Sequence, residues 1–249
     1  MLEWASPSII LSTRHYGEVD GIVSVLSIDQ GLYRGLVRAM GARKQSSTWQ
    51  MGNFIAAEWS AKLQDQLGHF KGELVRANFA SLASFPFAFT ILSSICAVAE
   101  GSLIERQPVP EIARLLFKIL TYLSLDPQEA EEKAFSQLLR WEVLLLAELG
   151  YGLDFSVCQE YGAQETYWVS PKTGKVVTEA MAGEWKPRLF RLPALFIDDT
   201  DQGTHQDWYD GLLLTGYFLE KHVFFLKNRP IPNARISLLE RVKKLLPNV

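Results

Sequence analysis

The sequence predicts an α+β fold, in which a small module of β-strands is followed by a mostly α-helical region. Three features support this prediction. The first 80 residues hold short alternating apolar runs that end at glycines, the apolar spacing becomes helical near residue 80, and residues 158–200 follow neither period. We therefore expect a strand domain over residues 1–80 and a helical domain over residues 81–249, with an irregular or β-like insert at about 158–200.

The strand module contains five predicted segments. Ser8–Ser12, Gly21–Ser27 and Gly31–Arg38 are short runs rich in Val, Ile and Leu, bounded by glycines or polar residues. The alternation continues over Trp49–Leu63, and Glu73–Phe79 is the last segment of the module. Strands this short favour a small barrel or sandwich over parallel βαβ units.

The helical region contains five segments with apolar residues three and four apart. Phe87–Gly101 is followed by Pro110–Leu123, where proline and Glu111 form a good first turn. Asp126 is the expected N-cap of a third helix, which ends near Gly150 or Gly152. Two further helices are predicted at Asp207–Asn228 and at about Ile236–Leu246.

Composition limits the class of protein. The chain has 249 residues, 48% hydrophobic and 21% charged, which is typical of a folded globular protein and excludes disorder. Two cysteines cannot form a disulfide framework, and Cys96 lies in an apolar run. We expect no signal peptide, because the chain opens without a basic flank and a long apolar stretch, and no membrane span. A cytoplasmic location is the prediction.

The third strand carries a concentration of positive charge. Arg34, Arg38, Arg43 and Lys44 fall within eleven residues, and no carboxylate occurs between Asp29 and Glu58. Such a surface can contact phosphates, although the net charge of −3 argues mildly against a nucleic-acid partner. Tyr33 and Trp49 are candidates for base stacking or, as is more common for such aromatics, for the barrel core.

A second basic run lies near the C-terminal end of the chain. There Glu240 is the only carboxylate among six cations, which are Lys227, Arg229, Arg235, Arg241, Lys243 and Lys244. A charge run of this kind is either a solvated face or a ligand site, and the sequence leaves both open.

The common catalytic signatures are missing from the sequence. There is no GxGxxG motif after a strand, no Walker lysine loop, no HExxH and no GxSxG. His205 and the nearby aspartates fit a solvated acidic loop better than a metal site. Glu142 could be a buried general acid, but with Arg140 and Lys133 nearby we expect it to be paired or partly exposed. We therefore expect a protein that is not an enzyme and needs no cofactor.

Residues along almost the whole chain, in order, match the sequence pattern of one known family. The matching residues are Trp4, Ile10-Leu11-Ser12, Tyr16-Gly17-Glu18, Gly31, Val37-Arg38, Gly41-Ala42-Arg43, Gly52-Asn53, Trp59-Ser60-Ala61-Lys62-Leu63, Gln66-Leu67-Gly68, Leu103-Ile104-Glu105-Arg106, Glu142, Leu149-Gly150-Tyr151-Gly152-Leu153-Asp154, Cys158, Val169-Ser170-Pro171-Lys172-Thr173-Gly174, Leu192-Pro193, Leu214-Thr215-Gly216-Tyr217-Phe218-Leu219 and Pro232-Asn233-Ala234-Arg235.

In these residues the chain resembles the bacterial RecO family of DNA-repair recombination mediators. This resemblance implies an N-terminal oligonucleotide/oligosaccharide-binding (OB) barrel followed by a helical domain. It implies a nucleoid-associated mediator that binds single- and double-stranded DNA, anneals complementary strands, and partners with RecR and with the C-terminal tail of single-strand-binding protein. Together these contacts help to load RecA onto coated DNA. Arg34, Arg38, Arg43 and Lys44 match the family's basic strand and following loop, and are expected to contact phosphates. Arg140 matches a basic position used for the tail, or else it pairs with Glu142 or a neighbouring helix.

The chain departs from the family at one position that matters for metal binding. Many members hold zinc with two CxxC pairs after the helix that ends Gly-Leu-Asp. Here Cys158 is present, Tyr161 stands three residues later, and no second pair follows. Tetrahedral zinc needs four ligands, so we expect no zinc.

Two other classes remain open from the sequence. The chain could be a general single-strand DNA-binding protein, or an adaptor whose OB barrel binds only another protein. The large helical half argues against a simple coating protein, and the acidic pI of about 5.9 fits an adaptor. A nuclease is disfavoured, because the clustered carboxylates that two-metal chemistry needs are not in the sequence.

Overall fold

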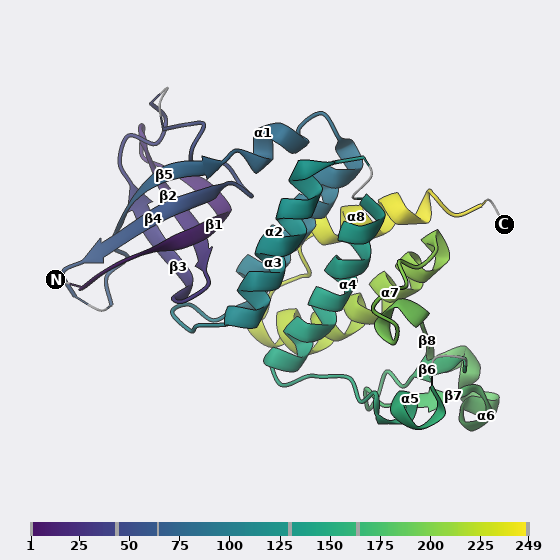
Figure 1. Ribbon diagram of the computed structural model, residues 1–249. Helices are drawn as coiled ribbons and strands as arrows, with labels where there is room; N and C mark the ends of the chain where they lie inside the picture. The colour runs from purple at the N-terminus through teal and green to yellow at the C-terminus, as the bar shows by residue number, and fades with distance from the viewer. Residues whose placement is uncertain (1, 43–44, 64, 129–130, 163–164, 248–249) are drawn as a thin grey trace. The chain divides into compact units, whose positions relative to one another are not determined.

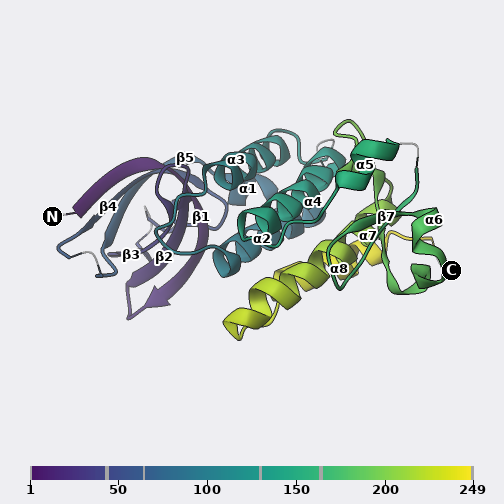
Figure 2. The ribbon, with the colours of Figure 1, turned by 90° about the horizontal axis from the view of Figure 1, so that it is seen from below.

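The computed structural model describes residues 2–42, 45–63, 65–128, 131–162 and 165–247, and the chain divides into two compact units, residues 1–128 and 129–249. Each unit is described by itself below. In Figures 1 and 2, unit 1 runs from purple to teal and unit 2 from teal through green to yellow.

Five strands form a closed barrel in unit 1. They are β1 (Leu2–Tyr16), β2 (Asp20–Ser27), β3 (Gly31–Val37), β4 (Phe54–Ala61) and β5 (His69–Arg76), joined in the order β1-β2-β3-β5-β4. β1 closes the barrel by antiparallel pairing with β4, and β3 meets β5 in parallel at Leu36 and His69. This is the topology of an OB barrel, and the predicted α+β class is confirmed.

Alternation along each strand fills the barrel with apolar side chains. The interior cluster comprises Ile10, Val23, Val25, Val37, Met40, Trp49, Ile55, Ala57, Trp59, Ala61 and Phe70, with Trp4 and Tyr33 packed against it. Trp59 donates its indole N–H to the carbonyls of Arg34 and Leu67, each at 3.2 Å, which satisfies its one polar atom inside the barrel.

Three helices follow the barrel within unit 1: α1 (Asn78–Leu82), α2 (Pro86–Ser102) and α3 (Pro110–Leu125). Proline occupies the first turn of α2 and of α3, where its missing N–H costs nothing. α2 and α3 lie side by side next to the barrel (Figures 1 and 2). Glu100 of α2 accepts hydrogen bonds from the hydroxyls of Ser12 and Ser24, both at 2.7 Å, so this helix covers part of the outer face of β1 and β2.

Unit 2 combines helices with a three-stranded sheet. The helices are α4 (Glu131–Glu148), α5 (Ser156–Tyr161), α6 (Glu179–Ala182), α7 (His205–Phe218) and α8 (Asn233–Lys243). The sheet has the order β7-β6-β8, from β6 (Tyr167–Val169), β7 (Val176–Thr178) and β8 (Phe190–Leu192). These short strands, with a 3-10 turn at Gly183–Arg188, make up the expected insert.

Several predicted boundaries are wrong. The strand expected over Trp49–Leu63 begins only at Phe54, because Asn53 donates to the carbonyls of residues 47 and 48 and closes a turn. The last strand of the barrel is His69–Arg76, and a helix has already begun at Asn78. Asp126, expected to begin the third helix, is the C-cap of α3 and donates its N–H to the carbonyl of Tyr122, and the next described helix begins at Glu131.

The helix expected at Asp207–Asn228 is present, but it consists of three successive helical segments of different types. It begins at His205 behind a Thr204–Asp207 capping box and continues as a π-helix (Leu219–Phe224) and a 3-10 turn (Phe225–Lys227). Asn228 ends it in the left-handed conformation, with φ of 51°.

The expected domain boundary near residue 80 falls where β5 gives way to α1, whereas the compact units divide at residues 128 and 129. The difference arises because α1, α2 and α3 share unit 1 with the barrel, and the boundary at residue 80 stays a prediction.

Candidate nucleic-acid interface

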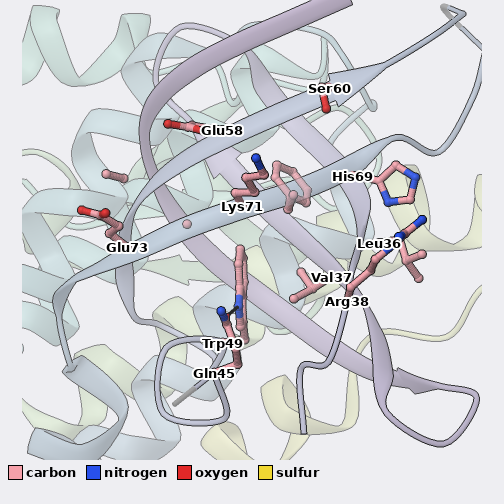
Figure 3. Close-up of a pocket in the computed structure, with 13 residues that line it drawn as sticks. Leu36, Val37, Arg38, Gln45, Trp49, Glu58, Ser60, His69, Lys71 and Glu73 are labelled. Atoms are coloured by element: carbon pink, nitrogen blue, oxygen red, sulfur yellow. Dashed lines mark hydrogen bonds between the residues drawn. The ribbon is translucent and has the colours of Figure 1, made fainter. Parts of the chain in front are cut away.

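A groove of about 680 Å³ opens on the barrel between the end of β3, the loop at residues 38–53 and the strands β4 and β5 (Figure 3). It exists because β3 and β5 pair at the single position Leu36–His69 and then diverge. Trp49 and Phe70 form its floor, and Arg38 and Gln45 come from the loop side.

The wall of the groove is the outward face of two paired strands. His69, Lys71 and Glu73 alternate outward on β5, opposite Ser60, Glu58 and Ala56 on β4. In the view of Figure 3, His69 and Arg38 lie at one end of the groove, Lys71 is central, and Glu58 and Glu73 lie at the other end. The groove is therefore cationic at the end nearer the β3–β5 contact.

A second groove of about 500 Å³ continues this surface toward the tips of the barrel. Tyr16, Leu36 and Leu67 contribute apolar surface to it, and Lys62 and His69 contribute polar groups. Leu67 and Lys62 belong to the β4–β5 loop (residues 62–68), one of the loops with which OB folds bind oligonucleotides. Apolar surface beside cations suits a ligand that has both bases and phosphates.

A fourth cation, Arg14, completes the surface on the other side of β3. Arg14, Ile22 and Leu36 are register partners across β1, β2 and β3, so they share the outward face in one row. Arg14 is exposed at the end of this row. Arg14, Arg38, Lys62 and Lys71 form no ion pair with any other residue that the structure describes.

The four predicted phosphate contacts have different outcomes. Arg38 is exposed and lines the groove. Arg34 is half-buried, with 26% of its side chain exposed, and its guanidinium pairs with Glu105 at 3.2 Å. Arg43 and Lys44 lie outside the described residues. The structure thus places Arg38 on the open surface and Arg34 in an ion pair.

The two aromatic candidates for stacking belong to the barrel interior. Trp49 is 3% exposed and donates its indole N–H to Gln45 at 2.7 Å. Tyr33 meets the rings of Trp4 and Trp59 edge to face, with centroids 5.0 Å away in both cases. Both rings therefore pack in or against the barrel core.

Sequence reasoning missed four cationic or titratable groups of this surface: Arg14, Lys62, His69 and Lys71. Alternation along His69–Arg76 could have placed His69 and Lys71 together on the outward face, had the strand been predicted at that position. Arg14 and Lys62 needed the register between strands, which the sequence alone does not supply.

In unit 2, the Arg140 guanidinium is held by backbone carbonyls. Its Nε donates to Leu195 at 2.8 Å, and Nη2 donates to Asp198 at 3.0 Å and Asp201 at 2.7 Å. The side chain is 12% exposed, and Asp199 lies 3.7 Å from its Nε. Burial lowers the pKa of this guanidinium, against the opposing effect of the nearby aspartates. Arg140 does not form an ion pair with Glu142.

Glu142 pairs instead with Arg235, which the sequence had placed in the basic C-terminal run. The carboxylate accepts from Arg235 Nε at 2.6 Å and from Nη2 at 2.9 Å, and both side chains are 2% exposed or less. Arg235 is therefore no part of a basic surface. The expectation that Glu142 is paired is confirmed, with Arg235 as its partner in place of Arg140.

The insert holds one thiol that could face a metal. Cys158 is buried in α5, and burial raises the pKa of its thiol. Within the described parts of the chain, no three His, Cys, Asp or Glu side chains come together as a metal site. The residues present do not fit the zinc that many family members hold, because one thiol supplies one of four ligands. In the same part of the chain, the Tyr167 hydroxyl donates a hydrogen bond to the carbonyl of Gly162 at 2.6 Å.

Among the helices that the structure describes, none combines the length and hydropathy needed to cross a membrane.

A closed barrel of OB topology, with exposed cations around a groove and followed along the chain by a largely helical unit, defines a class of OB-barrel proteins. Comparison with known families specifies the class. The profile described as "Recombination protein O N terminal" matches residues 1–78, and "Recombination protein O C terminal" matches residues 84–230. The chain belongs to the RecO family of bacterial DNA-repair proteins.

Three relatives illustrate the extent of the similarity. The chain is 49% identical over 247 residues to the DNA repair protein RecO of Gluconacetobacter diazotrophicus, with 99% of this chain and 97% of the relative covered. It is 43% identical to that of Granulibacter bethesdensis and 39% identical to that of Acidiphilium cryptum, each with 98% of this chain and 97% of the relative covered.

Proposed function

We propose that this protein is a recombination mediator that binds single- and double-stranded DNA on its barrel and anneals complementary strands. With RecR, it helps to load RecA onto DNA coated by single-strand-binding protein. Membership of the RecO family supports the general role in DNA repair. The observation that carries the DNA-binding part is a group of exposed cations that have no ion-pair partner among the described residues. Arg38, Lys71 and Lys62 line the two grooves, and Arg14 lies in the row of Leu36, which lines both.

Annealing by this surface requires no covalent step, and we propose that the protein is not an enzyme. Two strands that approach each other repel through their phosphates. Cations that neutralise these phosphates displace condensed counterions and lower the barrier to approach. The base edges remain free to pair if they are not held by hydrogen bonds, and the exposed cations that line the two grooves, Arg38, Lys62 and Lys71, are long side chains that can contact phosphates.

The partner contacts are the finer part of the proposal. The tail of single-strand-binding protein requires an apolar pocket with a cation at its rim. Arg140 already donates to three backbone carbonyls, so binding a tail carboxylate would have to compete with those bonds. Its role in tail binding stays a prediction. An Arg140→Ala variant tests it, provided that its stability is measured alongside its affinity for the tail.

The decisive experiment measures binding of a labelled single-stranded oligonucleotide by fluorescence anisotropy over a series of salt concentrations. We expect a steep fall of affinity with salt for the wild type. For Arg38→Ala/Lys71→Ala, the slope of log K against log salt should be lower by about 0.7 for each phosphate that the protein no longer neutralises. The matched control is Arg114→Ala, which removes an exposed cation of α3 that pairs with Glu111.

Three results would contradict the proposal. Absence of any oligonucleotide binding by the wild type would favour a protein adaptor. An unchanged salt slope in the double variant would place the DNA elsewhere. Binding without acceleration of annealing, on naked strands and on coated strands with RecR, would leave a general single-strand-binding protein.

A further inference from the structure

The segment Glu105–Gln107, between α2 and α3, runs along the edge of β3. Glu105 forms a parallel bridge with Leu32, and the N–H of Arg106 donates to the carbonyl of Leu32 at 2.7 Å. We call residues 105–107 the strap. It brings Glu105 to Arg34, 71 residues away in the sequence, where the two side chains form their ion pair.

The strap is held in place by several independent contacts. Arg106 adopts a left-handed backbone, with φ of 64°, and its Nη2 donates to the carbonyl of Gln66 in the β4–β5 loop at 2.8 Å. Its guanidinium lies 5.6 Å from the ring centroid of Tyr33 and 5.5 Å from that of Trp59. Gly31 provides room on the other side, since a Cβ there would lie 2.0 Å from the carbonyl oxygen of Gln107. The position of Glu105 is thus fixed by backbone and side-chain contacts other than the ion pair.

Arg34 itself lies beside the proposed DNA surface. It is two residues before Leu36 on β3, so both side chains point outward and are about 7 Å apart along the strand. Leu36 lines both grooves. Arg34 lies in the row next to that of Arg14, Ile22 and Leu36. Among the predicted phosphate contacts within the described residues, it is the one that already has an anionic partner.

We infer that Glu105 determines the affinity of the DNA interface by occupying Arg34 in place of a phosphate. A carboxylate and a phosphodiester present similar oxygens to a guanidinium. Because the strap holds Glu105 within the same unit, the carboxylate competes at a high effective concentration. A phosphate would have to displace it before Arg34 could add to the site. The inference rests on the proposed function, since it requires that the barrel binds DNA.

The physical consequence is a surface that binds DNA less tightly than its cation count allows. Annealing requires that each strand be released once it has paired, and loading of another protein requires that DNA be handed over. A built-in competitor lowers affinity without removing the cation. Where the local phosphate density is high, as when two strands lie on the surface, phosphates can displace Glu105 and bind Arg34.

The test replaces Glu105 with glutamine, which keeps the shape and removes the charge. We expect Glu105→Gln to bind a single-stranded oligonucleotide about 3- to 10-fold more tightly at low salt, with the salt slope larger by about 0.7. The matched control is Glu111→Gln, which removes an exposed, ion-paired carboxylate from α3 of the same unit. Because both variants change the net charge equally, the control isolates the site from the general effect of charge.

A double variant identifies Arg34 as the cation released. Arg34→Gln in the wild-type background is expected to change affinity by less than about 2-fold, since this cation is occupied, and Arg34→Gln/Glu105→Gln should bind no more tightly than the wild type. A tighter affinity that persists in the double variant, or an equal increase in Glu111→Gln, would overturn the inference. A large fall of affinity in Arg34→Gln alone would also overturn the inference, and this result can be obtained even if Glu105→Gln does not fold. Failure of the wild type to bind DNA at all would overturn the proposed function as well, whereas normal binding with no effect of Glu105→Gln would overturn only the inference.

Discussion

Replacing Glu142 with leucine should strongly destabilise unit 2, although leucine is apolar and the site is buried. Glu142 and Arg235 are bonded through two hydrogen bonds of 2.6 and 2.9 Å, and their side chains are 1% and 2% exposed. Arg235 also donates to the carbonyl of Leu212 at 3.0 Å and to the hydroxyl of Thr215 at 3.1 Å. The pair thus connects α4, α7 and α8.

The magnitude follows from what each substitution leaves behind. Glu142→Leu leaves a guanidinium buried without its counter-charge, and Arg235→Met leaves a carboxylate in the same position. Either change is expected to lower the free energy of unfolding by about 3–5 kcal/mol. The double variant Glu142→Leu/Arg235→Met removes both charges and keeps the volume. It should lie within about 2 kcal/mol of the wild type, because a well-packed apolar pair can replace a buried ion pair.

The assay is equilibrium denaturation of the four proteins, followed by circular dichroism and by tryptophan fluorescence. Since the chain has two compact units, two transitions are possible, and the one that the single substitutions shift is assigned to residues 129–249. Hydrogen exchange of the amides in α4, α7 and α8 checks this assignment, because their protection should fall in the single variants and recover in the double variant.

The reasoning would be refuted by additivity. If the double variant were destabilised by the sum of the two single effects, about 6–10 kcal/mol, the cost would come from poorer packing rather than from an unpaired buried charge. A small effect of either single variant would equally contradict the assignment, since it would mean that water or another group reaches the remaining charge.

Four further predictions concern other parts of the chain. Arg140→Ala should lower the free energy of unfolding by about 1–3 kcal/mol, as backbone carbonyls lose their donor, and the thermal melting temperature measures this. Gly31→Ala should lower the melting temperature by an amount equivalent to at least about 2 kcal/mol, through a positive φ and the close approach of the strap. Burial raises the pKa of the Cys96 and Cys158 thiols, so neither should react with a thiol reagent at mildly alkaline pH until denaturant is added. Burial, with a smaller effect of a neighbouring lysine, lowers the pKa of His222 from its ordinary 6.5. The folded state therefore disfavours protonation, its stability falls as the pH drops below 6.5, and the melting temperature of His222→Phe should depend less on pH across this range.

The strand content of the barrel could be predicted because it depends on local alternation. Each of β2 and β3 agrees closely with a glycine-bounded apolar run, since strands whose side chains are mostly buried consist of short runs of Val, Ile and Leu. Trp49 shows the limit of this reasoning. It is apolar and in phase with the following strand, but it enters the core from a loop that Asn53 closes by side-chain hydrogen bonds.

The candidate site was only partly predictable, because a residue in a basic stretch of the sequence can be buried or ion-paired in the folded protein. Arg34 lies in the longest stretch of the barrel without a carboxylate, and its partner Glu105 comes from a distant connection between two helices. Arg235 likewise belongs to the basic C-terminal run in the sequence, but in the structure it forms a buried ion pair with Glu142. Pairing of this kind depends on tertiary contacts that no local pattern records. Arg38 was predictable because it follows the end of a strand, where the chain turns outward.

The distribution of these charges explains how an acidic chain can present a cationic face. The outer surface of β1–β3 is divided into rows by strand register. In the row of Ser12, Ser24 and Arg34, the carboxylates of Glu100 and Glu105 bond to the strand side chains from α2 and from the strap. The next row, Arg14, Ile22 and Leu36, has no such carboxylate among the described residues, and it borders the grooves that hold Arg38, Lys62 and Lys71. Glu105, in the connection between α2 and α3, thus pairs with Arg34, whereas the cations near the β4–β5 loop have no ion-pair partner among the described residues. Local potential near this loop, and not the net charge of −3, governs the approach of a phosphate backbone.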